Sequence, residues 1–285
     1  MLKRDVVSGE DNLLRYPILL MGPPGIGKSP FVASMTDADE KVFYLDTDIS
    51  PSLIAYSLPK ERVTTWTRLI ELVREFLADD YFEWLAIDTL NGAYDLCYRQ
   101  VCDEKSIDSP SDLNDYGATW NQITKRFMNP LQAIEAKGKG LICTCHSTIT
   151  EVFIGAKKFN RWIPSFTGSS VNSAYAKVEG FFKILGFMQM EHITAPAVRI
   201  SQGKKGVKEQ LDVRKDVADV YETRLVHLQP SENWVAKDRS GRLPNVVEMP
   251  NDWRQDWQAF KDAFLAGRET DNEINDETET NNETN

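Results

Sequence analysis

Short apolar runs alternate with helical patterns through the first half of the chain. The runs show almost no polar alternation, and each ends in or is followed by a glycine, an acid or a histidine; they are residues 16–21 (YPILLM), 41–48 (KVFYLDTD), 81–87 (YFEWLAI) and 140–145 (GLICTC). Such runs are typical of strands buried on both faces. Helices are expected between them, at residues 30–35, 64–77, 94–102 and 120–136. The alternation predicts an α/β fold with a mostly parallel central sheet flanked by helices.

The pattern changes after His146. Residues 148–177 are rich in Gly, Ser, Lys and aromatic residues without a clear period, so we expect a basic-aromatic loop there. Antiparallel strands and hairpins are expected toward the C-terminus, at residues 181–190, 197–201, 224–228 and 234–236, with a turn at residues 203–206 (GKKG). A closing helix carries an aromatic stripe that is expected to pack in the core, formed by Trp253, Trp257, Phe260 and Phe264.

Composition favours one main domain followed by a short tail. The chain has 285 residues, of which 41% are hydrophobic, and this is enough for one large core at residues 1–267. Residues 268–285 are acidic and contain no aromatic residue, so they are expected to be disordered. The net charge of −10 argues against a general affinity for nucleic acid, although the chain without its tail is nearer neutrality.

The sequence gives no sign of a membrane protein. It has no apolar stretch of the ~20 residues that a membrane span needs, and its first residues lack the apolar core of a signal peptide. A cytoplasmic protein without membrane partners is therefore expected. The spacings of the four cysteines match no common zinc site, so they are interpreted as reduced thiols, partly buried.

A phosphate-binding motif follows the first apolar run. The pattern G-x-x-x-x-G-K-[ST] is matched at every fixed position by Gly22, Pro23, Pro24, Gly25, Ile26, Gly27, Lys28 and Ser29. Its glycines let backbone N–H groups surround a phosphate, and the next helix directs its positive end at the same anion. Lys28 is expected to contact the β- and γ-phosphates, and Ser29 to bind Mg²⁺. The motif predicts binding of ATP or GTP with Mg²⁺.

Two strand ends supply further candidates for the same site. Asp88 ends the apolar run WLAI and is the expected partner of the metal, through water, as in a Walker-B strand. His146 follows the run GLICTC. Ligand-contacting groups gather at the carboxyl ends of parallel strands, so His146 is either a sensor of the γ-phosphate or a histidine with a local structural role.

These residues together resemble the RecA-like ATPase core, and in particular the phage-encoded P-loop proteins of the AAA_24 type, which are related to single-strand-annealing recombinases. The resemblance covers residues 16–250 and rests on GPPGIGKS, YLDTD, WLAIDTL, LICTCH and WVAKDRSGRLP. It implies a RecA-like P-loop NTPase fold, ATP and Mg²⁺ as ligands, and the host cytoplasm as location if the protein is phage-encoded. Two positions depart from the pattern: the second strand ends in DTD instead of DTE, and Pro30 follows the motif.

The resemblance also implies the catalytic carboxylate. Thr89 stands where AAA+ proteins have a glutamate after the Walker-B aspartate, whereas the RecA-like class carries its catalytic carboxylate at the end of the second strand. Asp48 is the matching residue and Asp46 is the second choice. The alternative is that these acids only cap a turn.

A resemblance near the end of the chain implies an oligomer. The sequence KDRSG is similar to the K-x-R-x-G element of hexameric RecA-like helicases, in which the basic pair reaches the nucleotide of a neighbouring subunit. Lys237 and Arg239 would then act in trans in a hexamer or filament. The alternative is an exposed hairpin turn.

Nucleic acid is the partner that the same class implies. Members place DNA-contacting loops after the strand that ends at His146, which here would include Lys157, Lys158, Phe159, Arg161 and Trp162, with a second basic loop at Lys204, Lys205 and Lys208. Interleaved cations and aromatic rings suit single-stranded DNA. The acidic tail would compete with DNA or recruit a replication or recombination protein.

The function expected from the sequence is therefore a Mg²⁺-dependent ATPase in DNA recombination or replication, acting through single-stranded DNA binding or annealing. Three alternatives stay open. They are an AAA+ helicase loader, a small-molecule kinase, and a nucleotide-dependent switch with little turnover.

Overall fold

The structure is a computed structural model that describes residues 12–48, 52–168, 173–199 and 212–267. Its strands are β1 (Ile18–Gly22), β2 (Val42–Asp46), β3 (Lys60–Arg62), β4 (Trp84–Asp88), β5 (Gly140–Ile154), β6 (Lys157–Pro164), β7 (Ile184–Arg199), β8 (Asp212–His227), β9 (Lys237–Asp238) and β10 (Val246–Met249). Its α-helices are α1 (Lys28–Asp37), α2 (Trp66–Ala78), α3 (Leu90–Lys105), α4 (Ala118–Lys137) and α5 (Ala174–Phe181), and residues 256–267 are also helical. Short 3₁₀ helices lie at Leu13–Arg15, Ser52–Ala55, Pro110–Asp112 and Trp253–Gln255.

The described strands form one sheet with the order β10-β8-β7-β1-β5-β4-β2-β3, in which β6 also pairs with β5 and β9 with β7. The pairs within the segment from β7 to β3 are all parallel, while β8 and β10 are antiparallel to their neighbours. This confirms the predicted α/β fold with a mostly parallel sheet and antiparallel strands toward the C-terminus.

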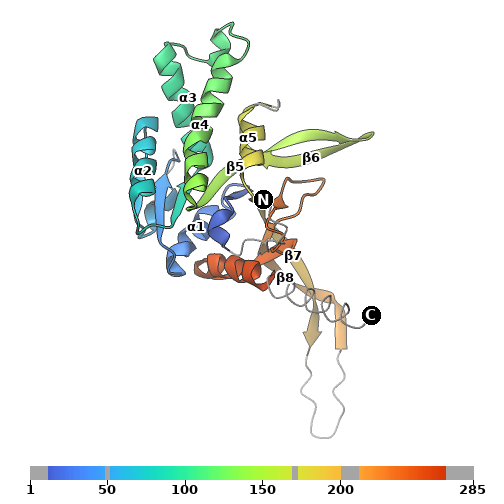
Figure 1. Ribbon diagram of the computed structural model, residues 1–285. Coiled ribbons are helices and arrows are strands. Elements are labelled where there is room, and N and C mark those ends of the chain that lie inside the picture. Colours follow the sequence, from blue (N-terminus) through green and yellow to red (C-terminus); the bar gives the residue numbers. More distant parts are fainter. Residues whose placement is uncertain (1–11, 49–51, 169–172, 200–211, 268–285) are drawn as a thin grey trace, which may run out of the picture.

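Each face of the parallel segment is covered by helices. Alternate residues of β1 show this: Leu19 and Met21 pack in the core with α2, α3 and α4, whereas Ile18 and Leu20 pack in the core with α1 and residues 256–267. All five residues of β1 are buried, because strands that are covered on both faces can be apolar at every position. Figure 1 shows the layers, with α2, α3 and α4 on one side and α1 and residues 256–267 on the other.

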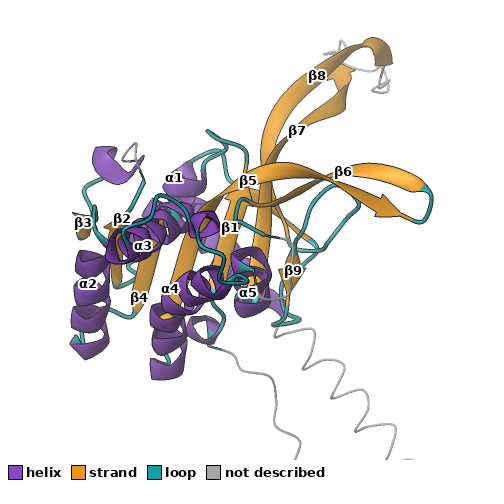
Figure 2. Cartoon of the chain, turned by 90° about the horizontal axis from the view of Figure 1, so that it is seen from above, coloured by secondary structure: helices purple, strands orange, loops and turns teal. Residues whose placement is uncertain are grey.

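Two β-hairpins extend from the helix-covered part of the sheet as arms (Figures 1 and 2). The first arm is formed by β5 and β6, and the second by β7 and β8. The first arm corrects the prediction of a loop at residues 148–177, since this segment contains the end of β5, all of β6 and the beginning of α5. Most side chains on both faces of this arm are at least partly exposed, so the apolar alternation of a half-buried strand is missing from the sequence.

Other boundaries near the C-terminus also differ from the predictions. Residues 181–190 and 197–201 were expected as separate strands, but β7 is continuous from Ile184 to Arg199. Residues 234–236 form no strand apart from one bridge between Trp162 and Trp234, and β9 begins at Lys237. The predicted turn at residues 203–206 and the acidic tail lie outside the described residues.

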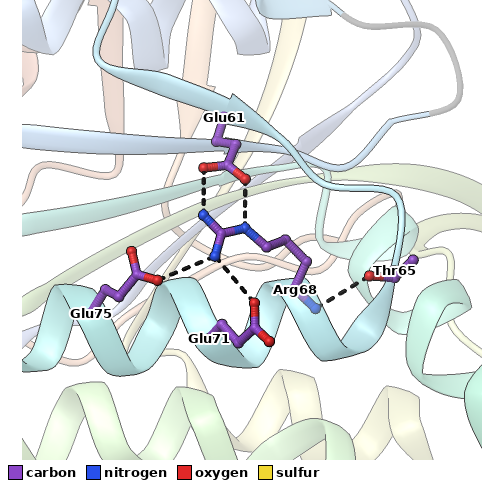
Figure 3. A network of polar contacts seen from close by, with 5 residues as sticks. All are labelled: Glu61, Thr65, Arg68, Glu71 and Glu75. Carbon is purple, nitrogen blue, oxygen red and sulfur yellow. Dashed lines mark hydrogen bonds and ion pairs between the residues drawn. The ribbon is translucent and has the colours of Figure 1, made fainter.

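A cluster of charged side chains joins the edge strand β3 to α2. Arg68 on α2 makes two hydrogen bonds to Glu61 on β3, at 2.7 and 3.0 Å, and further bonds to Glu71 and Glu75 on its own helix (Figure 3). Thr65 caps α2 by accepting a hydrogen bond from the backbone N–H of Arg68. These bonds fix the short β3 at the edge of the sheet.

The structure describes four cysteines, all of them buried free thiols. No helix within the described residues is long and apolar enough to span a bilayer.

The aromatic stripe of the closing helix predicts a test of its packing. Phe260 is fully buried and meets the ring of Phe31 on α1 edge-on, with 5.6 Å between the ring centroids. Phe260→Ala should lower the free energy of unfolding by about 3–5 kcal/mol, the range for removing a buried Phe side chain. Leu265→Ala is the control, because Leu265 lies on the same helix and is 44% exposed. Chemical denaturation measures both variants, and an equal loss in the two would contradict this packing.

Candidate functional site

The carboxyl ends of β1, β2 and β4 lie at the same end of the sheet, level with the middle of β5, which continues into the first arm. Gly22 at the end of β1 lies level with His146 on β5, and Asp46 at the end of β2 lies level with Asp88 at the end of β4. Because β5 lies between β1 and β4, Asp88 approaches the phosphate motif across one strand. The side chains that the sequence singled out from separate strands are therefore brought to one edge.

The phosphate motif connects β1 to α1 through backbone that favours glycine. Gly25 and Gly27 have φ angles of +78° and +106°, in the left-handed region that L side chains rarely adopt. Gly22 has no room for a side chain, since a Cβ there would lie 2.4 Å from the carbonyl oxygen of Met188. Pro30 falls in the first turn of α1, where its missing N–H has no intrahelical partner to lose.

Lys28 is almost buried beneath this loop, with 8% of its surface exposed. Its ammonium donates hydrogen bonds to the carbonyl oxygens of Gly22 (2.8 Å) and Pro23 (2.9 Å). A lysine ammonium has three donors, so one remains for a ligand. Burial lowers the pKa of Lys28, while the nearby Asp88 and Asp48 act in the opposite direction.

Asp88 is only 1% exposed and is held by the neighbouring strand. The hydroxyl of Thr144 on β5 donates a hydrogen bond to its Oδ1. Thr89, the next residue, caps α3 by accepting a hydrogen bond from the backbone N–H of Gly92, and its carbonyl accepts a bond from the hydroxyl of Thr47 (2.5 Å). The strand end, the helix start and the turn after β2 are thus tied together.

The two candidate acids after β2 differ in position. The strand ends at Asp46, so Asp48 lies two residues beyond it and not at the strand end as expected. Asp46 is 2% exposed, and burial raises its pKa, with a further contribution from Asp88. It accepts a hydrogen bond from the backbone N–H of Asp48, which makes it a support for the turn. Asp48 is more exposed, and its Oδ2 lies 3.7 Å from Nε2 of His146.

These residues enclose a cleft of about 370 Å³ at the end of the sheet. It is lined by Pro24, Gly25, Gly27, Lys28, Ser29, Pro30, Asp48, Tyr56, Asp88, Thr89 and His146. The cleft therefore combines a glycine-rich backbone, a lysine, a serine hydroxyl, two carboxylates and a histidine. This donor set fits a phosphate chain with a divalent cation: Lys28 and the backbone N–H groups suit the anion, and Ser29 and Asp88 suit Mg²⁺.

Lys237 and Arg239 lie away from this cleft. The strand β9 that begins with Lys237 pairs with Ile184 and Leu185 at the start of β7, the end of the sheet opposite to the phosphate motif. The ammonium of Lys237 donates to the carbonyl of Glu179, and burial together with the Arg239 charge lowers its pKa to about 8. The basic pair therefore does not contribute to the cleft of its own chain.

The basic and aromatic residues expected to contact DNA lie on the first arm, except for the second basic loop. Lys157 and Lys158 are exposed near its tip, where Lys158 pairs with Glu151 (2.5 Å). Phe159 follows them on β6. Arg161 lies nearer the base, where its Nε donates to the carbonyl of Glu232 (3.2 Å). Lys204, Lys205 and Lys208 lie outside the described residues.

Trp162 occupies a different environment from the other residues of this set. Its ring packs at the base of the arm against Phe187 on β7, with 6.1 Å between the centroids, and its backbone joins Trp234. Trp162 therefore also supports the base of the arm, and its expected contact with DNA stays a prediction.

Several residues of the site were missed by the sequence analysis. Thr144 has a sequence signal, because it is a polar residue inside the buried run LICTC. Tyr56 and Asn91 carry no comparable signal. Asn91 accepts a hydrogen bond from the backbone N–H of His146 (2.7 Å) and donates one to the carbonyl of Ser165 (2.5 Å), so it joins the cleft to the base of the first arm.

Comparison with known protein families gives a match over most of the chain. The AAA_24 family, described as an AAA domain, matches residues 15–240. The match spans all elements that form the cleft. A search of curated proteins found no match.

Proposed function

We propose that this chain, which belongs to the AAA_24 family of AAA domains, binds ATP with Mg²⁺ and hydrolyses it to drive a step in DNA recombination or replication. The family supports nucleotide binding and a P-loop ATPase. The observation that carries the proposal is the single cleft that contains Lys28, Ser29, Asp48, Asp88 and His146.

Each side chain of the cleft has a role that its position supports. Lys28, fixed by two carbonyls, offers its remaining donor to the phosphates, and Ser29 with Asp88 would hold Mg²⁺, the latter through water. The bound metal would neutralise part of the charge on the phosphate oxygens. Asp48 accepts a hydrogen bond from the attacking water and orients it, since it is the acid of the β2 turn that faces the cleft. His146 lines the cleft beside Asp48, with its Nε2 3.7 Å from the Oδ2 of that acid.

The role of Asp48 can be separated from that of Asp46. Asp48→Asn should lower kcat by about 10²–10⁴-fold, the range for loss of general-base catalysis. The affinity for ATP should stay close to that of the wild type, because Lys28 and the loop remain. Phosphate-release assays and binding of a non-hydrolysable ATP analogue measure the two effects.

Asp46→Asn is the matched control for this variant. Asparagine keeps an oxygen that accepts the hydrogen bond from the backbone of Asp48, so turnover should persist. Turnover that persists in Asp48→Asn and disappears in Asp46→Asn would assign the catalytic acid to Asp46.

The position of Lys237 and Arg239 supports action between subunits. They cannot act in their own cleft, because they lie at the opposite end of the sheet. In a ring or filament, this end of one subunit can face the cleft of the next. An arginine suits this task, since its planar guanidinium pairs with two phosphate oxygens at once.

A mixing experiment tests this arrangement. Lys28→Ala should lack a working cleft but keep its basic pair, and Arg239→Ala should keep the cleft but lack the arginine. Each variant alone should be inactive, and a mixture should regain ATPase activity in mixed oligomers. A mixture of Arg239→Ala with the double variant Lys28→Ala/Arg239→Ala serves as the control and should stay inactive. Full activity of Arg239→Ala at every protein concentration would rule out the proposed role.

The first arm is the surface that we propose for single-stranded DNA. It extends from the sheet (Figure 2), with Lys157 and Lys158 exposed near its tip and Phe153 71% exposed beside them. Cations meet the phosphates and an exposed ring can stack on a base. The acidic tail would compete for the same cations or bind a replication or recombination protein.

Salt dependence tests the arm as a DNA-binding surface. Removal of two phosphate contacts in Lys157→Ala/Lys158→Ala should weaken binding of an oligothymidylate and make the negative slope of log K against log salt less steep by about 1.4. Lys105→Ala/Lys137→Ala is the matched control, because these lysines are exposed at the ends of α3 and α4. Fluorescence anisotropy at several salt concentrations gives both slopes. An unchanged slope in the arm variant would exclude these contacts.

Stimulation of the ATPase separates the main proposal from the alternatives. Strong stimulation by single-stranded DNA supports a recombination or replication ATPase. Binding of ATP with little turnover under all conditions would support a nucleotide-dependent switch, and stimulation only by a helicase would support a loader.

A further inference from the structure

An arginine from the second arm lies against the phosphate loop. A Cβ built on Gly27 would lie 2.9 Å from Nη1 and 3.7 Å from Cδ of Arg224, which is on β8. The side of Gly27 that a side chain would occupy is therefore filled by the guanidinium. At the other end of the loop, the carbonyl of Met188 on β7 occupies the place where a side chain of Gly22 would lie. Both ends of the loop are thus backed by the base of the same hairpin.

The guanidinium is fixed by partners at the C-terminal end of the described chain. Nη1 and Nη2 of Arg224 donate to the two carboxylate oxygens of Asp256, at 2.7 and 2.9 Å, and Nη2 also donates to the carbonyl oxygen of Pro250 (2.7 Å). Asp256 is fully buried and Arg224 is 15% exposed. Burial raises the pKa of Asp256, while the hydrogen bonds and charge of Arg224 act in the opposite direction.

Asp256 is itself held close to the helix that follows the loop. The residue after it, Trp257, donates its backbone N–H to the hydroxyl of Ser34 on α1 (2.9 Å), and its ring packs on Phe31. The loop, α1, Arg224 and Asp256 therefore form a closed set of contacts. A displacement of the guanidinium would remove the group that packs against Gly27.

We propose that Arg224 is a positioning residue for the phosphate loop, and that Asp256 holds its guanidinium in place. This inference rests on the proposed nucleotide binding and names residues outside the sequence motif that this binding needs. A loop rich in glycine has many conformations to lose when it closes around a phosphate. A fixed surface behind Gly27 restricts these conformations before the nucleotide binds, which lowers the entropic cost of binding.

A purely structural role is the alternative: the pair would only attach residues 256–267 to the sheet. The two roles differ in their response to removal of both charges. Removing one partner of a buried ion pair leaves an unpaired charge and destabilises the fold, whereas replacing both by apolar side chains of similar size is often neutral. The double replacement can therefore preserve the fold and still remove the guanidinium from Gly27.

The test compares Arg224→Met/Asp256→Leu with the wild-type protein, using the full chain and Mg²⁺ with ATP or ADP as the probe. The melting temperature without nucleotide should be near that of the wild type. The Kd for each nucleotide should rise by at least roughly tenfold, because part of the binding free energy would then be used to order the loop. Arg224→Lys keeps the charge but cannot make the paired bonds to Asp256, so its Kd should lie between the two.

A second ion pair, which is more exposed than Arg224–Asp256, provides the control. Arg126 on α4 and Glu104 on α3 are joined by two hydrogen bonds of 2.6 and 2.9 Å, and neither residue lines the cleft. Arg126→Met/Glu104→Leu should leave the Kd for nucleotide unchanged. This variant shows whether loss of any paired arginine affects binding.

The outcomes separate this inference from the proposed function. A wild-type Kd in the folded Arg224→Met/Asp256→Leu variant would overturn the role of Arg224 alone, and the nucleotide site would stand. If wild-type protein does not bind nucleotide, or binds it equally well after Lys28→Ala, then the proposed function and this inference both fail. A raised Kd in the Arg224 variant and an unchanged Kd in the Arg126 variant would establish the inference.

Discussion

The Lys28 ammonium and the Asp88 carboxylate are both buried at the end of the sheet, and hydrogen bonds with neighbouring groups compensate the cost of burying these two charges. An isolated charge in the interior is costly, so each needs partners with fixed geometry. Lys28 has two carbonyls of its own loop, and Asp88 has the hydroxyl of Thr144. The hydroxyl of Thr144 is available to Asp88 because β4 and β5 are parallel neighbours in register, whereas the partners of Lys28 come from its own loop.

The same constraint explains why the polar groups of these strands lie at the strand ends, in the cleft, while the rest of each strand is apolar. The strands are buried on both faces, so their polar residues are confined to the edge where the sheet stops. At this end of the sheet, the buried Asp46 supports the turn that carries Asp48. An acid that is buried and one that faces the cleft can therefore lie two residues apart and have different roles.

The parts of this site that follow from local sequence were predicted, and those that depend on distant contacts were not. The phosphate motif is a continuous segment between a strand and a helix, and Asp88 marks the end of an apolar run, so both can be found by pattern. The exact end of β2 could not be predicted, because Asp46, Thr47 and Asp48 are all polar and the sequence does not mark which of them ends the strand. The first arm was predicted as a loop, because a hairpin with two largely exposed faces lacks a hydrophobic period. Arg224 and Asp256 are single charged residues without a sequence motif, and only the fold brings Arg224 to Gly27 and Asp256 to Arg224.

The strand β1, which carries the phosphate loop, lies between β7 and β5, so the bases of the two arms contact the cleft through different residues. Asn91 joins the backbone of His146 to Ser165 at the end of the first arm. Met188 and Arg224 place the second arm against Gly22 and Gly27. Close-packed contacts of this kind transmit small displacements, because the interior has little free volume. The loop therefore touches the base of the second arm directly, and His146 is joined to the base of the first arm through one residue. In this AAA domain, the phosphate loop and the segment at His146 are thus each supported by the base of a different hairpin that extends from the sheet.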